Sequence, residues 1–439
     1  MRKIIFGTVF LFLSICEAQE EKVLTLDECI EIAVTRNLTI KQNQNNLIAA
    51  QSNKKQAFYN FFPDLNITGG YSIIEGSRFD NNSGRFVSAT TKQSNPEISA
   101  GMSVFNAFAN HHLMNRRAHE YQSSYYQLED SKILTKANVI RSYLSVLVDL
   151  ENLRVSNQLL EFLESQFERE KKRVSVGVGN LESVYNFQSQ VANERLNNVN
   201  LENLFQSDLL ALSQLLQMND GSSIKVTPLD SSTTNVLMEF DSYDIVLKDV
   251  LANSFQLKSS MELKQASKNQ LSQARADRYP SIGLGAGYGS QFSTNNEGDF
   301  INQLENFNYQ FIGASIQIPI FNRYQTQNWI DVAKVNFMNA QIAEEQAIQD
   351  VTNSTQRDYL DLVSAQTSYQ TAQENFEALN QTFEFIKKRF EAGNTDFYTY
   401  LESLNNKNRA EAQLINAKYT IILRKRILDL YRGQGSTLN

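Results

Sequence analysis

The stretch QAFYNFFPDLNITGGY at residues 56–71 recurs 217 residues later as QARADRYPSIGLGAGY at residues 273–288. Both copies keep Gln-Ala at the start, an aromatic residue before proline, and Gly-Tyr at the end. The chain therefore contains two copies of one structural unit. We expect the two halves to complete one symmetric object.

The positions of glycine and proline predict the same order of elements in both halves. Neither residue occurs from 102 to 176 or from 320 to 392, so each half contains one very long helix. Of the 18 glycines, 11 fall within residues 69–101 and 283–313, which predicts strands and loops there. Each half should run helix, strand, loop, strand, long helix, turn, helix.

Four segments follow from this pattern. Residues 1–18 have a basic start and an apolar run, which predicts a secretory signal peptide cut after Ala18. The sequence before Cys16 also resembles a lipoprotein cleavage site, so lipidation of Cys16 and its removal with the signal peptide both remain open. Residues 19–218 and 243–439 are the two repeats, and residues 219–242 predict a surface linker.

Charge and hydropathy exclude two classes of protein. The net charge of -7 and the lack of a basic stripe argue against a nucleic-acid partner. After the signal peptide, no apolar run reaches the roughly 18 residues of a transmembrane helix. A membrane-spanning role could come only from strands.

The lengths of the predicted helices favour a wall of parallel helices. A helix over residues 108–174 would be about 100 Å long at about 1.5 Å per residue, and one over 323–391 would be similar. The shorter helices of each half would add up to about the same length, and they cover residues 26–61, 181–216, 244–279 and 396–431. Two adjacent apolar seams in the first long helix favour a tube of helices over an ordinary bundle.

Four segments show the period of a β-strand. Ile98, Ala100, Met102 and Val104 alternate with small or polar residues, and residues 312–318 repeat this pattern. Their expected partners are the glycine-rich residues 65–74 and 282–291. Such alternation suits a barrel between lipid and water, although a soluble sheet packed on helices would show it too. Residues 76–96 and 290–308 would form polar outer loops. Since small barrels begin at about eight strands, four strands per chain require several copies.

These motifs together resemble the TolC-type outer-membrane efflux channel family. The resemblance rests on Leu24-Thr25-Leu26-Asp27-Glu28 at the start, on residues 57–65, on Pro319-Ile320-Phe321-Asn322, and on Arg389-Phe390-Glu391-Ala392-Gly393. It covers the chain from about residue 24 to its C-terminus. The resemblance implies a mainly α fold with a membrane β-barrel contribution: long coiled-coil helices form a periplasmic α-barrel, and three chains share a 12-stranded barrel in the outer membrane.

The same resemblance implies the partners and the function. The chain would be a homotrimer embedded in outer-membrane lipid, docked on a periplasmic adaptor (membrane fusion protein) and an inner-membrane transporter. It would be the exit duct of a tripartite efflux or type I secretion system, with no enzymatic activity and no cofactor. The alternative from a different class is a secreted or periplasmic structural coiled-coil protein without channel activity.

Two turns share the pattern Arg-x-x-x-Gly, namely Arg173 to Gly177 and Arg389 to Gly393. Glycine allows a left-handed turn at the end of a helix, and arginine complements the helix dipole there. That structural role suffices for the pattern. The resemblance adds that these turns form the periplasmic tip that touches the adaptor.

Acidic residues near the turns are candidates for an entrance gate. Glu182, Asp396 and Glu402 could simply stabilise helix starts. In a trimer they could instead form carboxylate rings that favour cations. The family's two acidic gate positions fall on Thr399 and Glu402, so Thr399 departs from the pattern. The spacing of His111, His112 and His119 predicts no metal site.

Overall fold

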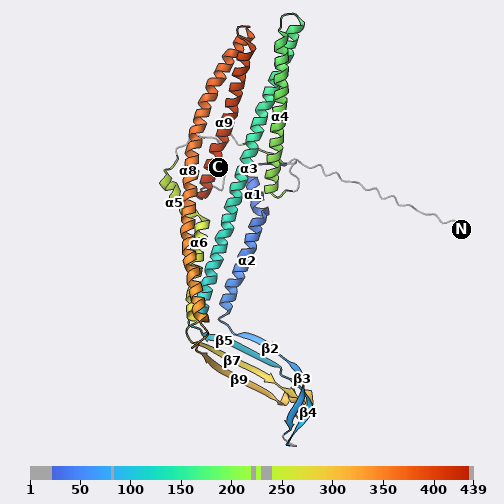
Figure 1. Cartoon of the computed structure of the whole chain (residues 1–439), viewed down its shortest axis with the longest axis vertical. Coiled ribbons are helices and arrows are strands. Elements are labelled where there is room, and N and C mark those ends of the chain that lie inside the picture. The colour runs from blue at the N-terminus through green and yellow to red at the C-terminus, as the bar shows by residue number, and fades with distance from the viewer. Residues whose placement is uncertain (1–21, 81–83, 219–223, 229–239, 435–439) are drawn as a thin grey trace, which may run out of the picture. The chain divides into compact units, whose positions relative to one another are not determined.

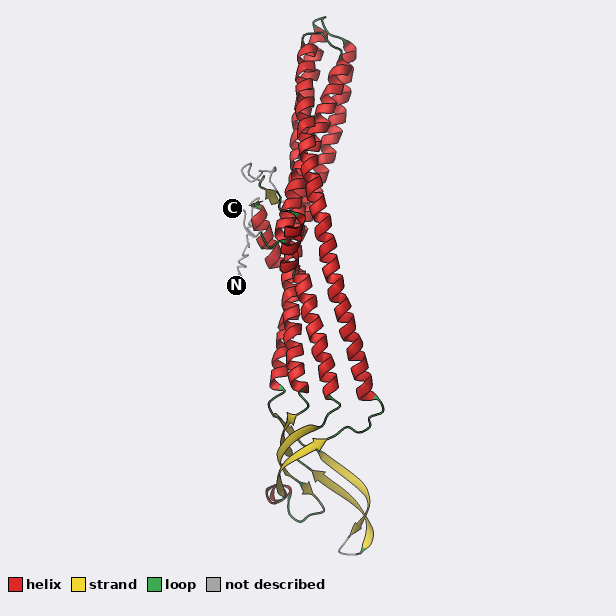
Figure 2. Ribbon diagram, turned by 90° about the vertical axis from the view of Figure 1, so that its left-hand side faces the viewer, coloured by secondary structure: helices red, strands yellow, loops and turns green. Residues whose placement is uncertain are grey.

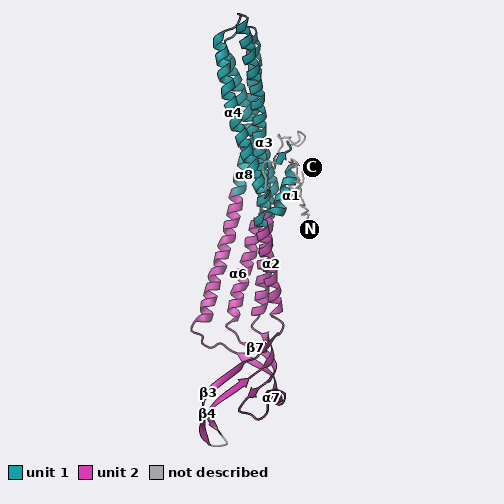
Figure 3. Cartoon of the chain, turned by 90° about the vertical axis from the view of Figure 1, so that its right-hand side faces the viewer, with its two compact units in different colours: residues 1–40, 132–253, 354–439 teal, residues 41–131, 254–353 magenta. Residues whose placement is uncertain are grey.

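The computed structural model describes residues 22–80, 84–218, 224–228 and 240–434 (Figure 1). The predicted signal peptide and Cys16 lie outside these residues. Two compact units make up the chain (Figure 3). Unit 1 comprises residues 1–40, 132–253 and 354–439, and unit 2 comprises residues 41–131 and 254–353.

The long helices occur where the absence of glycine and proline predicts them. Helices α3 (Ala109–Ser175) and α8 (Gln325–Glu391) each have 67 residues. Helices α4 (Leu181–Leu215) and α9 (Phe397–Tyr431) each have 35. Both bounds of α8 are 216 higher than those of α3, from 109 to 325 and from 175 to 391. The internal repeat is therefore a repeat of structure.

The helices expected over residues 26–61 and 244–279 are each broken in two. The first consists of α1 (Leu26–Arg36) and α2 (Leu38–Tyr59), and the second of α5 (Tyr243–Asn253) and α6 (Phe255–Ala276). At the breaks, the Asn37 side chain accepts from the Ile40 amide, and the Ser254 hydroxyl accepts from the Leu257 amide. Both side chains cap the helix that follows, so each break is the start of a new helix.

Four strands form one antiparallel sheet in unit 2, in the order β2-β5-β7-β9. They are β2 (Asp64–Thr68), β5 (Glu97–Phe105), β7 (Ser281–Ser290) and β9 (Asn308–Gln317). The register places one row of apolar residues across all four, since Leu65 pairs with Ala100, Ala100 with Ala286, and Ala286 with Ile312. The opposite face carries mostly small and polar residues, as the alternation predicts, but Phe311 and Tyr309 of β9 also lie on it.

The segment expected to be a polar loop over residues 76–96 is mostly a hairpin. Strands β3 (Tyr71–Asp80) and β4 (Arg85–Ser94) pair along ten residues (Figure 2). The predicted strand over 65–74 is divided between β2 and β3, which belong to different sheets. Residues 290–308 also contain structure, namely β8 (Phe292–Ser293), which pairs with β4, and helix α7 (Phe300–Asn306). Serine and threonine in β4 suit an exposed strand, which is why a polar sequence there does not mark a loop.

A second departure concerns the predicted linker over residues 219–242. Its residues 224–226 form strand β6 (Ile224–Val226), which pairs in parallel with β1 (Lys22–Leu24). The buried Tyr143 hydroxyl lies 3.1 Å from the Leu24 carbonyl oxygen and 2.7 Å from that of Thr227. This contact holds both strands against α3. Burial raises the pKa of Tyr143 well above its usual value, so the hydroxyl stays protonated and can donate.

Backbone strain marks the passage from strand to long helix in both halves. Ala107 and Phe108 have φ angles of 52° and 66°, and the equivalent Arg323 and Tyr324 have 54° and 69°. These are left-handed conformations in which a Cβ atom is unfavourable. No glycine occurs at these corners, so the sequence gives no sign of them. Among the described residues, no helix is long and apolar enough to cross a membrane.

Candidate functional site

The predicted turn residues close two helices of unit 1 with the same hydrogen bonds. At the end of α3, the Gly177 amide donates to the Val174 carbonyl and the Val178 amide to the Arg173 carbonyl, both at 3.0 Å. At the end of α8, the Gly393 amide donates to Phe390 and the Asn394 amide to Arg389, at 3.0 and 2.8 Å. This pair of bonds is the Schellman motif. The pattern Arg-x-x-x-Gly thus describes two equivalent turns.

Glycine is required for conformation at both turns and for space at one. Gly177 and Gly393 have φ angles of 80° and 75°, which favour glycine. Gly179 is different: a Cβ atom there would lie 2.6 Å from the backbone nitrogen of Val174. The sequence analysis did not single out Gly179. Its equivalent in the second half is Thr395, so only the second turn accepts a side chain.

The arginines of the two turns are held within their own hairpins. The Arg173 guanidinium donates to Glu170, with Nη1 to Oε1 at 3.0 Å, and Glu170 is buried. The Arg389 guanidinium donates to the Asn394 carbonyl at 3.3 Å. Arg173 and Arg389 therefore support the turns directly. The contact of this tip with an adaptor remains a prediction.

Three of the four gate candidates, Asp396, Thr399 and Glu182, take part in hydrogen bonds at the starts of α4 and α9. Asp396 is the N-cap of α9, where its carboxylate accepts from the Thr399 amide at 2.9 Å and from the Thr399 hydroxyl at 2.7 Å. These hydrogen bonds hold the pKa of Asp396 below its usual value. Glu182 lies in the first turn of α4 and accepts from the Tyr398 hydroxyl at 3.4 Å. Asp396 and Thr399 are thus occupied as a helix cap.

Glu402 differs from the other candidates. It is exposed on α9, and within the described part of the chain no hydrogen bond or ion pair joins it to Glu182, Asp396 or Thr399. Its carboxylate is available to a second copy of the chain or to a cation.

An aromatic cluster missed by the sequence analysis lies under the two turns. Phe187 of α4 is fully buried and meets Phe397 of α9 edge to face, with ring centroids 4.7 Å apart. Tyr400 stacks on Phe390, with centroids 4.5 Å apart, and also meets Phe383. The cluster joins the α3–α4 hairpin to the α8–α9 hairpin. The signal was the concentration of aromatic residues on both sides of Gly393, from Phe383 to Tyr400.

The histidines belong to unit 2 and lie on α3. His119 Nδ1 lies 2.6 Å from Glu262 Oε2 of α6. In the ranges that the structure describes, no three His, Cys, Asp or Glu side chains are grouped to hold a metal ion.

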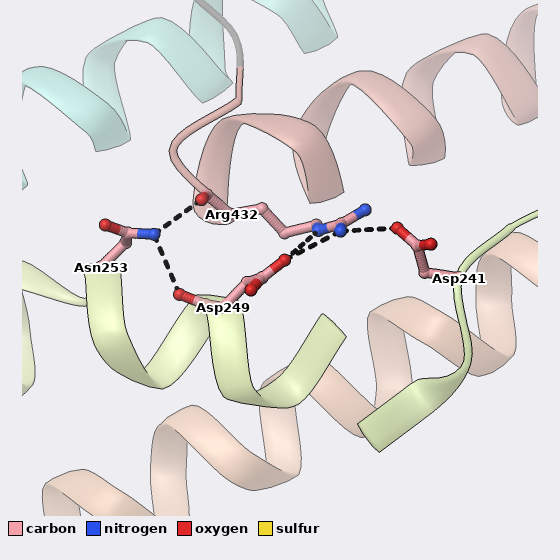
Figure 4. Close-up of polar contacts among 4 residues, drawn as sticks. All are labelled: Asp241, Asp249, Asn253 and Arg432. Atoms are coloured by element: carbon pink, nitrogen blue, oxygen red, sulfur yellow. Dashed lines mark hydrogen bonds and ion pairs between the residues drawn. The ribbon is translucent and has the colours of Figure 1, made fainter. Parts of the chain in front are cut away.

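A half-buried arginine, Arg432, fixes the C-terminal end of α9 to α5 (Figure 4). The Arg432 guanidinium donates to Asp249 Oδ2 at 2.8 and 3.1 Å and to Asp241 Oδ2 at 2.6 Å. The Asn253 amide group donates to the Arg432 carbonyl at 2.7 Å. A cavity of about 250 Å³ beside this network is lined by residues that include Tyr359, Lys425 and Asp429.

Comparison with known proteins gives a consistent result. A family described as "Outer membrane efflux protein" matches residues 29–217 and 246–433. Outer membrane protein TolC of Vibrio cholerae is 21% identical over 406 residues, which are 90% of this chain and 89% of that protein. The "Toxin and drug export protein A" of Aggregatibacter actinomycetemcomitans is 20% identical over 305 residues, 69% of this chain and 64% of that protein.

Solved structures show the same fold. The outer membrane protein VceC of Vibrio cholerae gives a TM-score of 0.80 at 14% identity, over 94% of this chain and 97% of that one. Two of the curated relatives are matched over less than two thirds of their own lengths, 63% and 64%.

Proposed function

The chain belongs to the outer membrane efflux protein family, and from that premise we propose that it is the exit duct of an efflux or type I secretion system. In this role it passes solutes from an inner-membrane pump and a periplasmic adaptor to the outside. Its place is the outer membrane, from which it extends into the periplasm. The family assignment favours this function over a structural coiled coil without channel activity.

The single observation that carries the proposal is the open four-stranded sheet of unit 2. Its edge strands β2 and β9 are exposed along their whole lengths. The apolar face of the sheet includes Leu65, Ile67, Ile312 and Ile316, which are 69%, 82%, 87% and 67% exposed. Apolar side chains this exposed need a lipid or protein cover. Outer-membrane lipid covers one face of the sheet when the other face lines an aqueous channel.

The glycines of β7 belong to the channel-facing side. A Cβ atom at Gly287 would lie 2.4 Å from the Phe311 ring, and one at Gly289 would lie 2.5 Å from the Tyr309 ring. The two glycines therefore make room for Phe311 and Tyr309 of β9, which lie over β7 on the face opposite the apolar one.

The open edges also support a homotrimer. Backbone groups on an unpaired strand edge cannot be left unsatisfied in lipid. Four strands are too few to close a barrel, and β2 of one copy pairing with β9 of the next gives twelve strands for three copies. Helix α4 supports the same assembly, because it exposes an apolar stripe that includes Tyr185, Leu196 and Val199. Neighbouring copies would cover this stripe.

The tip of unit 1 is the proposed contact with the adaptor. Arg173, Gly177, Arg389 and Gly393 build two equivalent turns, so an adaptor can bind both in the same way. The entrance gate is proposed at the helix starts just beyond the turns. Glu402 is the gate residue with a free carboxylate, while Asp396 and Thr399 form the cap that orients α9. Glu182 is linked to α9 through Tyr398.

Conductance of the purified protein in a planar bilayer tests the channel. We expect discrete ion currents from a trimer, and a protein that remains monomeric and soluble without detergent would refute the proposal. Replacement Glu402→Gln should weaken block of the current by trivalent cations, because the ring of carboxylates would lose its charge. Glu374→Gln, which alters an exposed acid on α8, is the matched control. Equal block in both variants would exclude the ring at Glu402.

A further inference from the structure

Two carboxyl groups meet between α3 and α4 in unit 1, away from the turns. Asp149 of α3 is 5% exposed, and its Oδ2 atom has no hydrogen-bond partner. The carboxyl group of Asp208 on α4 lies beside it and acts on its charge. The Ser145 hydroxyl, one helical turn before Asp149, donates to Asp208 Oδ2 at 2.5 Å. Neither carboxyl group belongs to the tip or the gate.

The surroundings of Asp149 are apolar. Val146 precedes it by three residues and Leu153 follows it by four, so both share its face of α3, and both are buried. From α4, Leu209 and Leu212 belong to the same apolar cluster as Val146. A carboxylate in such a place is costly unless it is neutralised.

The charged groups around Asp149 offer no compensation. Asp208 of α4 is the charged group that acts on it, and its charge is of the same sign. In the part of the chain that the structure describes, no lysine, arginine or histidine of α1, α3, α4 or α9 contributes a positive charge to Asp149. Two ionised carboxylates side by side repel each other, so a proton on one of them would stabilise the contact.

We propose that buried Asp149 and half-buried Asp208 form a proton-binding site, in which one shared proton holds α3 against α4. The Ser145 hydroxyl donates to Asp208 Oδ2, so this oxygen is an acceptor. Asp149 is the more buried of the two carboxyl groups and holds the proton, which it donates to Asp208. The proton comes from solvent and returns to it, and no other group changes its charge.

The shared proton makes the α3–α4 contact depend on pH. Burial first, and then the charge of Asp208, raise the pKa of Asp149 to about 6 from 3.8. Because the folded-state pKa is the higher one, the stabilisation is complete below pH 3.8 and is lost as the pH rises through about 6. Above that pH, two like charges repel across the α3–α4 contact. Slightly acidic surroundings should therefore tighten this hairpin.

Infrared difference spectra of the full-length protein in detergent test the proton directly. In the wild type, we expect the carbonyl band of a protonated carboxylic acid to disappear with a midpoint near pH 6. Asp149→Asn should abolish this band, and Asp208→Asn should move its midpoint to lower pH because the repelling charge is gone. Asp350→Asn, at an exposed aspartate of α8, is the control and should leave the band unchanged.

Hydrogen exchange provides the second readout. After correction for intrinsic rates, peptides over residues 140–155 and 203–215 should open more often at pH 7.5 than at pH 5. Each unit of pKa shift whose stabilisation is lost corresponds to about a tenfold increase in opening. Asp149→Asn should remove this pH dependence. A band that survives Asp149→Asn, or a midpoint that Asp208→Asn leaves unmoved, would overturn the proposal. So would protection by millimolar Ca²⁺ at pH 7.5 that Asp149→Asn abolishes, since the pair would then be a metal site.

Discussion

The ring of Phe187 on α4 meets the ring of Phe397 on α9 at an interplanar angle of 76°, with centroids 4.7 Å apart. Phe187 follows the first turn and Phe397 follows the second. The contact thus joins the helices that follow the two equivalent turns, although the counterpart of Phe187 in the second half is Ser403. Any movement of one hairpin tip relative to the other must break it.

Phe187→Ala should loosen this tip. Truncation of a buried phenylalanine costs about 3–5 kcal/mol, because apolar contacts are lost and a cavity remains. The expected result is a matching drop in the opening free energy of residues near both turns, measured by hydrogen exchange. Gln188→Ala, at the exposed neighbour on α4, should change it by less than about 0.5 kcal/mol. Equal effects of the two replacements would exclude the aromatic coupling.

Alanine replacements at the first turn should differ in severity. At Gly177, a Cβ atom meets open space and only the left-handed φ is unfavourable, which costs about 1–2 kcal/mol. At Gly179, the new atom would collide with the backbone of Arg173 and Val174, so Gly179→Ala should be the more harmful. Exchange rates of amides 173–182 measure both. Gly177→Asn should be milder than Gly177→Ala, because asparagine tolerates this conformation.

Arg432→Ala should release the end of α9 from α5. Hydrogen bonds to charged groups contribute about 1.5–3 kcal/mol, and Asp249 would lose its partner. Arg432→Lys should recover part of this loss, since one ammonium cannot donate to both carboxylates in the same geometry. Limited proteolysis near residues 240–253 reports the release. The control Arg424→Ala, also on α9, removes an exposed ion pair with Asp361 of α8 and should cost about 1 kcal/mol or less.

Ala107→Gly should stabilise the protein. Glycine relieves the left-handed strain at φ 52°, and part of the gain is offset by the greater freedom of the unfolded chain. The net effect should be up to about 1 kcal/mol, visible as a higher melting temperature in detergent. Ala109→Gly, at the first residue of α3, should have the opposite sign. A lower melting temperature for Ala107→Gly would show that the corner is not strained.

Acid should weaken the start of α9. Because the folded-state pKa of Asp396 is lowered by the Thr399 hydrogen bonds, its contribution is present above the unfolded value of 3.8 and is lost as the pH falls through the lower folded-state value. Asp396→Ala should therefore speed the exchange of amides 398–402 at neutral pH and have little effect in strong acid. Thr399→Val keeps the backbone donor and should show a smaller change. An effect of Asp396→Ala that does not depend on pH would contradict the capping role.

The sequence predicted the long helices within one or two residues, because glycine and proline bound them so clearly. It also predicted the four-stranded sheet, whose alternation fixes the face of each strand. It did not predict the breaks at Asn37 and Ser254, although both residues are good helix caps. These two lie 217 apart, as do the repeated motifs, so a comparison of the two halves could have revealed them.

Other features leave no mark in a single sequence. The left-handed corners at Ala107 and Arg323 use residues with a Cβ atom, and tertiary packing overrides their local preference. The Asp149–Asp208 contact joins residues 59 apart, from 149 to 208, and depends on which faces of α3 and α4 meet. The turns were predicted correctly because their chemistry is local. The aromatic cluster beneath them was not, because it forms between the two halves.

The pairing of β1 with β6 sets an order of events during biogenesis. Residues 22–24 are among the first to be synthesised, yet their partners at 224–226 follow about 200 residues later. Until then the N-terminal strand has exposed edges and the Tyr143 hydroxyl lacks the carbonyl of Thr227 as an acceptor. This small sheet can therefore form only after the whole first repeat has been synthesised. A chain that stopped before residue 224 would expose an unpaired strand to quality-control proteases.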